Sequence, residues 1–170
     1  AFCLFIAIET VLLNFLSLFR EITFWGMLLS HGAILALWLI WLRTAAFPVQ
    51  AVLHRLYSAC RSLARKPAMM ALIPVLLLLV YMLCKYPPTT WDSMTYHLAR
   101  VVHWMQNQSI DYYFTSISRQ NHMGPGAEFL LLFFQILSGS DYLATSVQFI
   151  AFLLLPGAYY YLLRALKVLQ

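Results

Sequence analysis

Long apolar runs limit what this chain can fold into more than any other feature of its sequence. An α-helix needs about 20 residues to cross the roughly 30 Å of hydrocarbon in a lipid bilayer. Five apolar runs, most of them near this length, occupy residues 2–19, 22–42, 68–84, 127–138 and 142–163. They predict an all-α fold, a multi-span transmembrane helical bundle that forms a single domain over residues 1–170.

The run at 127–138 leaves an alternative open. A helix of this length is shorter than the hydrocarbon layer is thick. The segment therefore either crosses the membrane with its ends extended or enters and returns on one side. We expect it to cross and to form a hairpin with the run that follows.

The composition excludes the folds of soluble enzymes. Hydrophobic residues make up 62% of the chain and charged residues only 10%, whereas soluble domains contain about 25% charged residues. So few charged side chains cannot cover the surface of a soluble domain of 170 residues.

The positions of the basic residues predict the orientation in the membrane. No acidic residue lies between residues 43 and 67, but five basic ones do: Arg43, Arg55, Arg61, Arg65 and Lys66. Because loops rich in Lys and Arg stay in the cytoplasm, the 43–67 loop is predicted to be cytoplasmic and the 85–126 loop external, in an integral, multi-pass protein of the plasma (inner) membrane. The basic loop either sets only this topology or also binds anionic membrane lipids; we expect no nucleic-acid partner.

The external loop carries a predicted amphipathic helix next to the membrane. Pro87-Pro88 ends the incoming helix, and Thr89, Thr90 or Asp92 can cap a new one of about four turns. A helical period places the members of one apolar face together: Met94, Leu98, Val101, Val102 and Met105. The opposite face carries Ser93, Tyr96, His97, Arg100, His103 and Trp104. Such a helix is expected to lie along the membrane surface, with its polar face towards an interfacial cleft.

Asp92 is the main candidate for a catalytic residue. It follows a predicted span and begins the amphipathic helix, so its carboxylate can cap that helix by accepting hydrogen bonds from free amides. The same carboxylate, close to the membrane and accessible to water, can also act as a general base that takes a proton from an acceptor hydroxyl.

The cations of the external loop are candidates for binding a phosphate group. Arg100, Arg119 and Lys85 carry fixed positive charges, and His97 is a further candidate beside them. A cation held in place favours the departure of a phosphate group, which gains charge as its ester bond breaks. Alternatively, these residues only anchor the loop among lipid headgroups. The His and Cys residues lack the spacing of a metal site, so no metal and no cofactor are expected.

Glu128 is a possible second acid. It opens the helix after Gly124-Pro125-Gly126, where free backbone amides favour a negative charge. That structural role is one explanation of the residue. The other is that its carboxylate faces the same cleft as Asp92 and orients the acceptor or a cation.

The order of these elements resembles a known group of enzymes. Asp92 just after a span, the helix from Tyr96 to Met105, Arg119-Gln120, and the sequence Gly124-Pro125-Gly126-Ala127-Glu128 look like the GT-C membrane glycosyltransferases, and most of all glycosyltransferase family 39, the branch of the dolichyl-phosphate-mannose protein mannosyltransferases. The resemblance covers roughly residues 85–163. Two features depart from the family pattern: Ser93 follows Asp92 where a second acid is common, and Gly124-Pro125-Gly126 replaces a Pro-Pro pair.

The resemblance implies an enzyme that transfers a sugar, with inversion, from a polyprenyl-phosphate carrier to a hydroxyl-bearing acceptor on the external face. Asp92 would be the base. The chain begins inside one apolar run and ends after another, so we expect it to be an N-terminal fragment of a longer protein and inactive alone. The sugar and the acceptor are unknown. The alternative is a multi-span transporter or lipid-binding scaffold without transferase activity.

Overall fold

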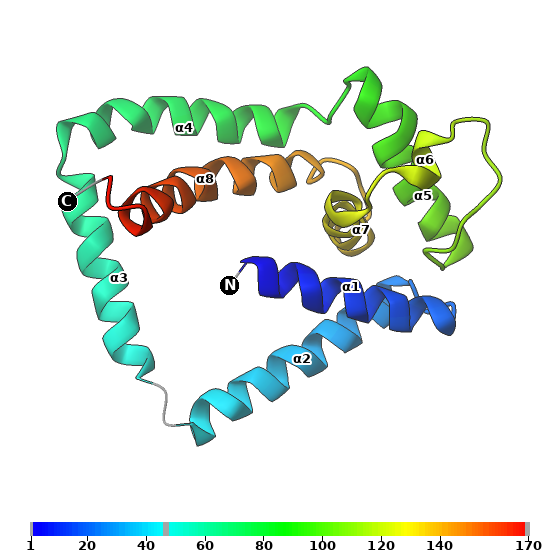
Figure 1. Cartoon of the computed structure of the whole chain (residues 1–170), viewed down its shortest axis with the longest axis horizontal. Coiled ribbons are helices and arrows are strands. Elements are labelled where there is room, and N and C mark those ends of the chain that lie inside the picture. Colours follow the sequence, from blue (N-terminus) through cyan, green and yellow to red (C-terminus); the bar gives the residue numbers. More distant parts are fainter. Residues whose placement is uncertain (1, 46–47, 169–170) are drawn as a thin grey trace. The chain divides into compact units, whose positions relative to one another are not determined.

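The computed structural model describes residues 2–45 and 48–168, and within them it is all-helical. Residues 1, 46–47, 169 and 170 of the predicted domain and loop lie outside the described residues. The elements in chain order (Figure 1) are α1 (Phe2–Leu18), α2 (Phe24–Thr44), α3 (Val49–Ala64), α4 (Pro67–Lys85), the π-helical turn η1 (Ser93–His97), α5 (Leu98–Asn107), α6 (Arg119–His122), α7 (Gly126–Ser138) and α8 (Thr145–Ala165). The predicted all-α class is confirmed.

The chain divides into two compact units. One unit combines the chain up to Met27 with the chain from Tyr86 onwards. The other covers Leu28–Lys85 and contains most of α2 together with α3 and α4, and α3 packs on α4. Residues 86–126 of the predicted external loop belong to the first unit, together with α1 and α7.

Each of the five predicted spans coincides with a helix, namely α1, α2, α4, α7 and α8. Two of them, α2 and α8, have 21 residues and are long and apolar enough to cross a membrane, whereas the apolar stretches of α1, α4 and α7 are shorter. Met27 is the buried residue of α2, and α8 has none. These two helices therefore differ from the core helix of a soluble protein, which is mostly buried.

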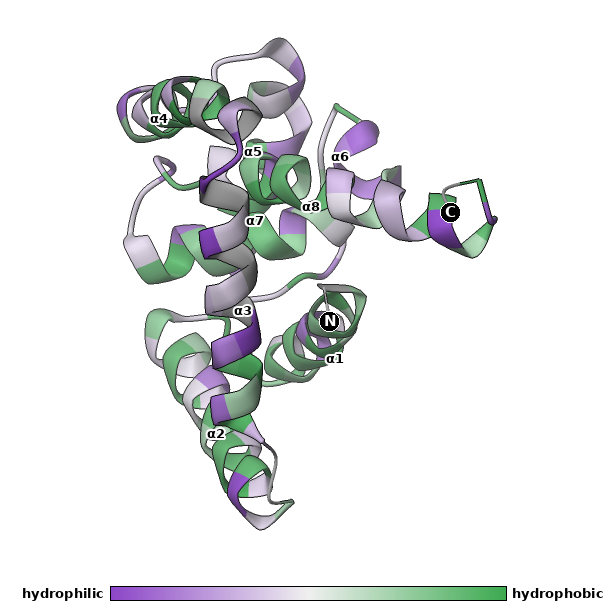
Figure 2. Ribbon diagram, turned by 90° about the vertical axis from the view of Figure 1, so that its left-hand side faces the viewer, coloured by the Kyte–Doolittle hydropathy of each residue, from purple (hydrophilic) through white to green (hydrophobic). Residues whose placement is uncertain are grey.

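The predicted 43–67 loop contains a helix, α3, which no continuous apolar run predicts. Apolar and basic residues alternate in α3 with a helical period, so no continuous apolar run marks it. Figure 2 shows the contrast between α3, which carries hydrophilic residues along its length, and the largely hydrophobic α2 and α4.

In the first unit, α7 lies at the centre of the packing. It contacts α5 on one side and α1 on another. The shared core consists of Leu13, Leu16, Ile22, Met27, Val101, Trp104, Phe129, Leu132 and Ile136. A buried hydrogen bond of 2.9 Å between Ser17 and Ser109 ties the segment just after α5 to α1. This packing holds the start of α5 in a fixed position relative to α7.

The predicted faces of the amphipathic helix are partly wrong. On the predicted apolar face, which we expect to rest on lipid or on the helical bundle, Leu98 and Val101 are buried in the protein and Met94 and Val102 are exposed. Tyr96, Arg100 and Trp104, which we placed on the polar face, are buried. The physical reason is that η1 has π-helical geometry, which changes the angle per residue across residues 93–97, and that α5 is covered both by α7 and by the segment around α6.

Candidate functional site

The candidate site lies where η1 continues into α5. Thr90 caps this helix: its hydroxyl accepts a hydrogen bond from the Ser93 amide at 3.3 Å and lies 2.7 Å from the Ser93 hydroxyl. Asp92 adopts a helical backbone conformation, and its carboxylate makes no capping hydrogen bond. Since Thr90 performs the capping role, the exposed Asp92 carboxylate is not needed for it.

Arg100 is buried beneath the site, with 2% of its surface exposed. Its guanidinium donates to three backbone carbonyl groups: Nε to Gln120, and Nη2 to Arg119 at 3.1 Å and to Met123 at 2.9 Å. Its Nη1 donates to Glu128 Oε1 at 3.3 Å. These bonds occupy most of the five N–H donors of the side chain, so Arg100 holds the α6 segment against α5 and has little capacity left for a ligand.

Glu128 supplies the negative charge that compensates Arg100. The residue is 1% exposed, and its Oε1 also lies 2.9 Å from Nδ1 of His97. Because a carboxylate only accepts hydrogen bonds, the His97 ring donates in this pair. The second oxygen, Oε2, is buried and has no partner among the described residues. Glu128 thus links α7 to η1 and α5 from below the surface.

Gln120 is a functional-site residue that the sequence analysis missed. It is 5% exposed, its Nε2 donates to the Thr95 carbonyl at 2.7 Å, and its Oε1 accepts from Tyr113 at 3.0 Å and from Thr115 at 2.9 Å. All these bonds cross from one part of the loop to another. No sequence pattern predicts that a glutamine side chain will join separate parts of a loop by hydrogen bonds. The one indication in the sequence was that Gln120 follows Arg119, a candidate site residue.

Tyr96 connects the two exposed charged residues of the site. Its pKa is raised above 10, first because burial disfavours the phenolate and then because of the negative charge of Asp92 and a hydrogen bond with it. The Arg119 guanidinium lies 5.9 Å from the centre of the Tyr96 ring and opposes this rise. The Tyr96 ring also lies 4.3 Å from that of His97.

Arg119 is exposed, and its guanidinium has no hydrogen-bond or ion-pair partner among the described residues. Its backbone carbonyl, in contrast, is held by Arg100. The side chain is therefore fixed at its base and open at its charged end, as a ligand-binding arginine requires.

The structure brings together five of the six residues proposed from the sequence. Asp92 and Arg119 lie at the surface beside Tyr96, His97 is half-buried, and Arg100 and Glu128 lie beneath them. The sixth, Lys85, ends α4 and belongs to the other compact unit. Within the described part of the chain, no three His, Cys, Asp or Glu residues are grouped closely enough to hold a metal ion.

The arrangement offers a base and a cation at one surface. An exposed carboxylate can take a proton from a hydroxyl group, and an exposed guanidinium can bind a phosphate oxygen. Comparisons of the chain with protein families, with curated proteins and with solved structures found no match.

Proposed function

We propose that this chain is part of a polyprenyl-phosphate-sugar-dependent glycosyltransferase of the GT-C type, with Asp92 as the general base. The observation that carries the proposal is the geometry around Tyr96, where two exposed charged groups lie at the same surface: a carboxylate that caps no helix, and a guanidinium with no ion pair to any of the described residues. The resemblance of residues 85–163 to glycosyltransferase family 39 suggests which reaction these two groups would catalyse, namely the transfer of a sugar from a polyprenyl-phosphate carrier.

In the proposed reaction, Asp92 removes the proton from an acceptor hydroxyl as its oxygen attacks the anomeric carbon of the sugar. The bond between that carbon and the phosphate oxygen breaks, the configuration inverts, and the phosphate leaves on its lipid carrier. Arg119 compensates the charge that develops on the leaving phosphate. Both groups act at the membrane surface because the lipid carrier keeps the donor there.

The buried residues take positioning roles in this proposal. Arg100 and Glu128 were candidates for phosphate binding and for a second acid, but their contacts with each other and with the α6 segment favour holding Arg119 and His97 in place. His97, with 34% of its side chain exposed, remains a candidate for contact with the donor. A phosphate-binding role for Lys85 is proposed from the sequence alone.

The proposal includes a membrane arrangement. We propose that α1, α2, α4, α7 and α8 form a multi-pass bundle, with residues 85–126 on the external face of the plasma (inner) membrane. The exposed apolar surfaces of α2 and α8 support this proposal, because lipid would cover them.

The test is the Asp92→Asn substitution in the complete protein that contains this chain. Loss of the general base should lower the transfer of sugar from a radiolabelled polyprenyl-phosphate donor by about 10²- to 10⁴-fold, because asparagine cannot accept the proton. Membrane insertion should not change, since Asp92 is exposed and caps no helix.

Asp111→Asn provides the matched control, because Asp111 is an exposed acid in the same loop. This control should keep near-normal transfer. If Asp92→Asn also keeps near-normal transfer, the enzyme proposal is wrong and the transporter or lipid-binding scaffold becomes the better interpretation.

A further inference from the structure

Helix α3 has an apolar side and a basic side, neither of which the proposed transferase uses. Val49, Val52, Leu53 and Tyr57 are exposed on one side of it. At 100° per residue they lie opposite Ser58, Ser62 and Arg65, with Arg61 between the two sides. A helix of this kind, with apolar and basic faces, suits the boundary between water and lipid.

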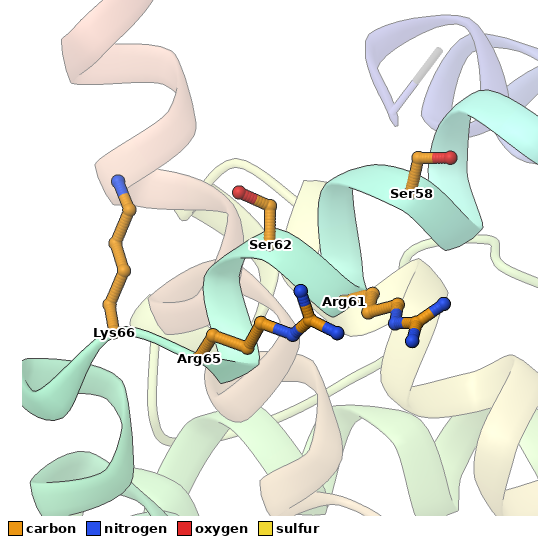
Figure 3. A pocket seen from close by; sticks show the side chains of 5 residues that line it. All are labelled: Ser58, Arg61, Ser62, Arg65 and Lys66. Atoms are coloured by element: carbon orange, nitrogen blue, oxygen red, sulfur yellow. The ribbon is translucent and has the colours of Figure 1, made fainter.

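The basic side contains a shallow, open depression at the end of α3. It is lined by Ser58, Arg61, Ser62, Arg65 and Lys66 (Figure 3). Three cations and two hydroxyl groups thus line one hollow. Arginine and lysine donors together with serine hydroxyls are the groups that bind phosphate oxygens.

Among the described residues, no acidic side chain forms a salt bridge with these cations. All three are exposed and have no salt bridge among the described residues, and the sequence from 43 to 67 contains no acid. Arg61 and Arg65 stand one helical turn apart, where like charges repel each other. A bound anion would remove this repulsion, so the cluster is better suited to an occupied than to an empty site.

The surroundings of the depression favour a lipid over a free anion. A site for soluble phosphate needs no exposed apolar side chains on the other face of its helix. Here Leu53 and Tyr57 are 59% and 63% exposed on that face. The other helices of the same unit, α2 and α4, are strongly apolar.

We infer that α3 lies in the headgroup layer of an anionic membrane, with its apolar side towards the acyl chains, and that Arg61, Arg65 and Lys66 bind the phosphate of an anionic phospholipid. This inference is independent of the transferase proposal, because it uses residues of the other compact unit.

The experiment measures how much phosphatidylglycerol and phosphatidylcholine the whole 170-residue chain retains. The chain is purified in a neutral detergent, titrated with each lipid, and analysed by native mass spectrometry. Arg61→Gln removes a charge from the depression, and Arg55→Gln removes one from an exposed position of the same helix outside it. Circular dichroism verifies that both variants keep their helical content.

We expect phosphatidylglycerol to bind more tightly than phosphatidylcholine. Arg61→Gln should weaken phosphatidylglycerol binding about fivefold, the usual effect of one basic residue at an anionic surface, while Arg55→Gln changes it less than about twofold. An excess of inorganic phosphate should not displace the lipid.

Three results would overturn the inference. Equal retention of the two lipids would exclude selectivity for an anionic headgroup. Equal weakening by the two substitutions would leave only diffuse attraction by the basic helix. Displacement by inorganic phosphate would mean that the depression binds a soluble anion.

Discussion

At the scale of single residues, the buried pair of Glu128 and Arg100 controls the position of the surface groups above it. Arg100 holds the carbonyl of Arg119, and Glu128 holds the ring of His97. Removal of one member of a buried pair leaves the other charge uncompensated, which is more costly than the absence of both. The pair is therefore the most sensitive polar contact of the site.

Glu128→Gln tests this dependence. Glutamine keeps the shape and one oxygen acceptor but removes the charge that compensates Arg100, so the free energy of unfolding should fall by about 3 kcal/mol. Unfolding in detergent micelles, followed by circular dichroism, measures the change. Glu21→Gln alters an exposed carboxylate and should change the free energy of unfolding by less than about 0.5 kcal/mol. Similar losses in the two variants would contradict the buried-pair description.

The pKa of Tyr96 reports the geometry of the site without any activity assay. Asp92→Asn removes a negative charge and should move this pKa back towards 10, whereas Arg119→Ala removes a positive charge and should raise it further. Titration of ¹³C-labelled tyrosine rings by NMR measures the shift, with the Tyr96→Phe spectrum providing the assignment. An unchanged pKa in Asp92→Asn would show that the two side chains are not in contact.

The same pKa has a defined effect on stability. Since the folded state raises the pKa of Tyr96, it holds the phenol proton more tightly than the unfolded state does. The stabilisation is complete below the unfolded pKa of about 10 and is lost as the pH rises through the higher folded value. Tyr96→Phe should remove this part of the decline at alkaline pH.

At the scale of elements, the contact of α7 with α5 and α1 keeps the site in place. Leu132 of α7 lies in the shared core with no exposed surface. Both the start of α5 and the loop that follows α5 depend on this packing, because α6 is too short to form a core of its own.

Leu132→Ala should lower the free energy of unfolding by about 3 kcal/mol, since the lost side chain leaves a cavity between three helices. Leu4→Ala truncates an exposed leucine of α1 and should change it by less than about 0.5 kcal/mol. Chemical unfolding in micelles compares the two, and hydrogen exchange should show faster exchange in α5 for Leu132→Ala alone. Equal protection of α5 in both variants would mean that α7 does not support it.

At the scale of the whole molecule, the proposed topology places the two loops on opposite sides of the membrane. Ser116→Cys introduces an exposed thiol in the 85–126 loop and Ser62→Cys one on α3, in a chain whose Cys3, Cys60 and Cys84 are replaced by alanine. A maleimide that cannot cross membranes should label position 116 in intact cells. It should label position 62 only after the cells are permeabilised. The opposite pattern would reverse the orientation and remove the external site.

The sequence by itself determined which segments are helical wherever the pattern was local. Runs of apolar residues marked α1, α2, α4, α7 and α8, because helix formation in an apolar stretch depends on neighbouring residues of the chain. The pattern that marks the amphipathic α3 is equally local, but it is the helical period at which apolar and basic residues recur, not a continuous apolar run.

The tertiary structure decided which side chains of the site are buried. From the sequence, Arg100 was a candidate for phosphate binding and Glu128 was either a helix-start residue or a second acid; only the packing of α7 and the α6 segment on α5 places them together beneath the surface. Gln120 gained its hydrogen bonds in the same way, from residues up to 25 positions distant in the chain. Burial depends on contacts between distant segments, and the π-helical turn at Ser93–His97 further changed which side of the helix those segments cover.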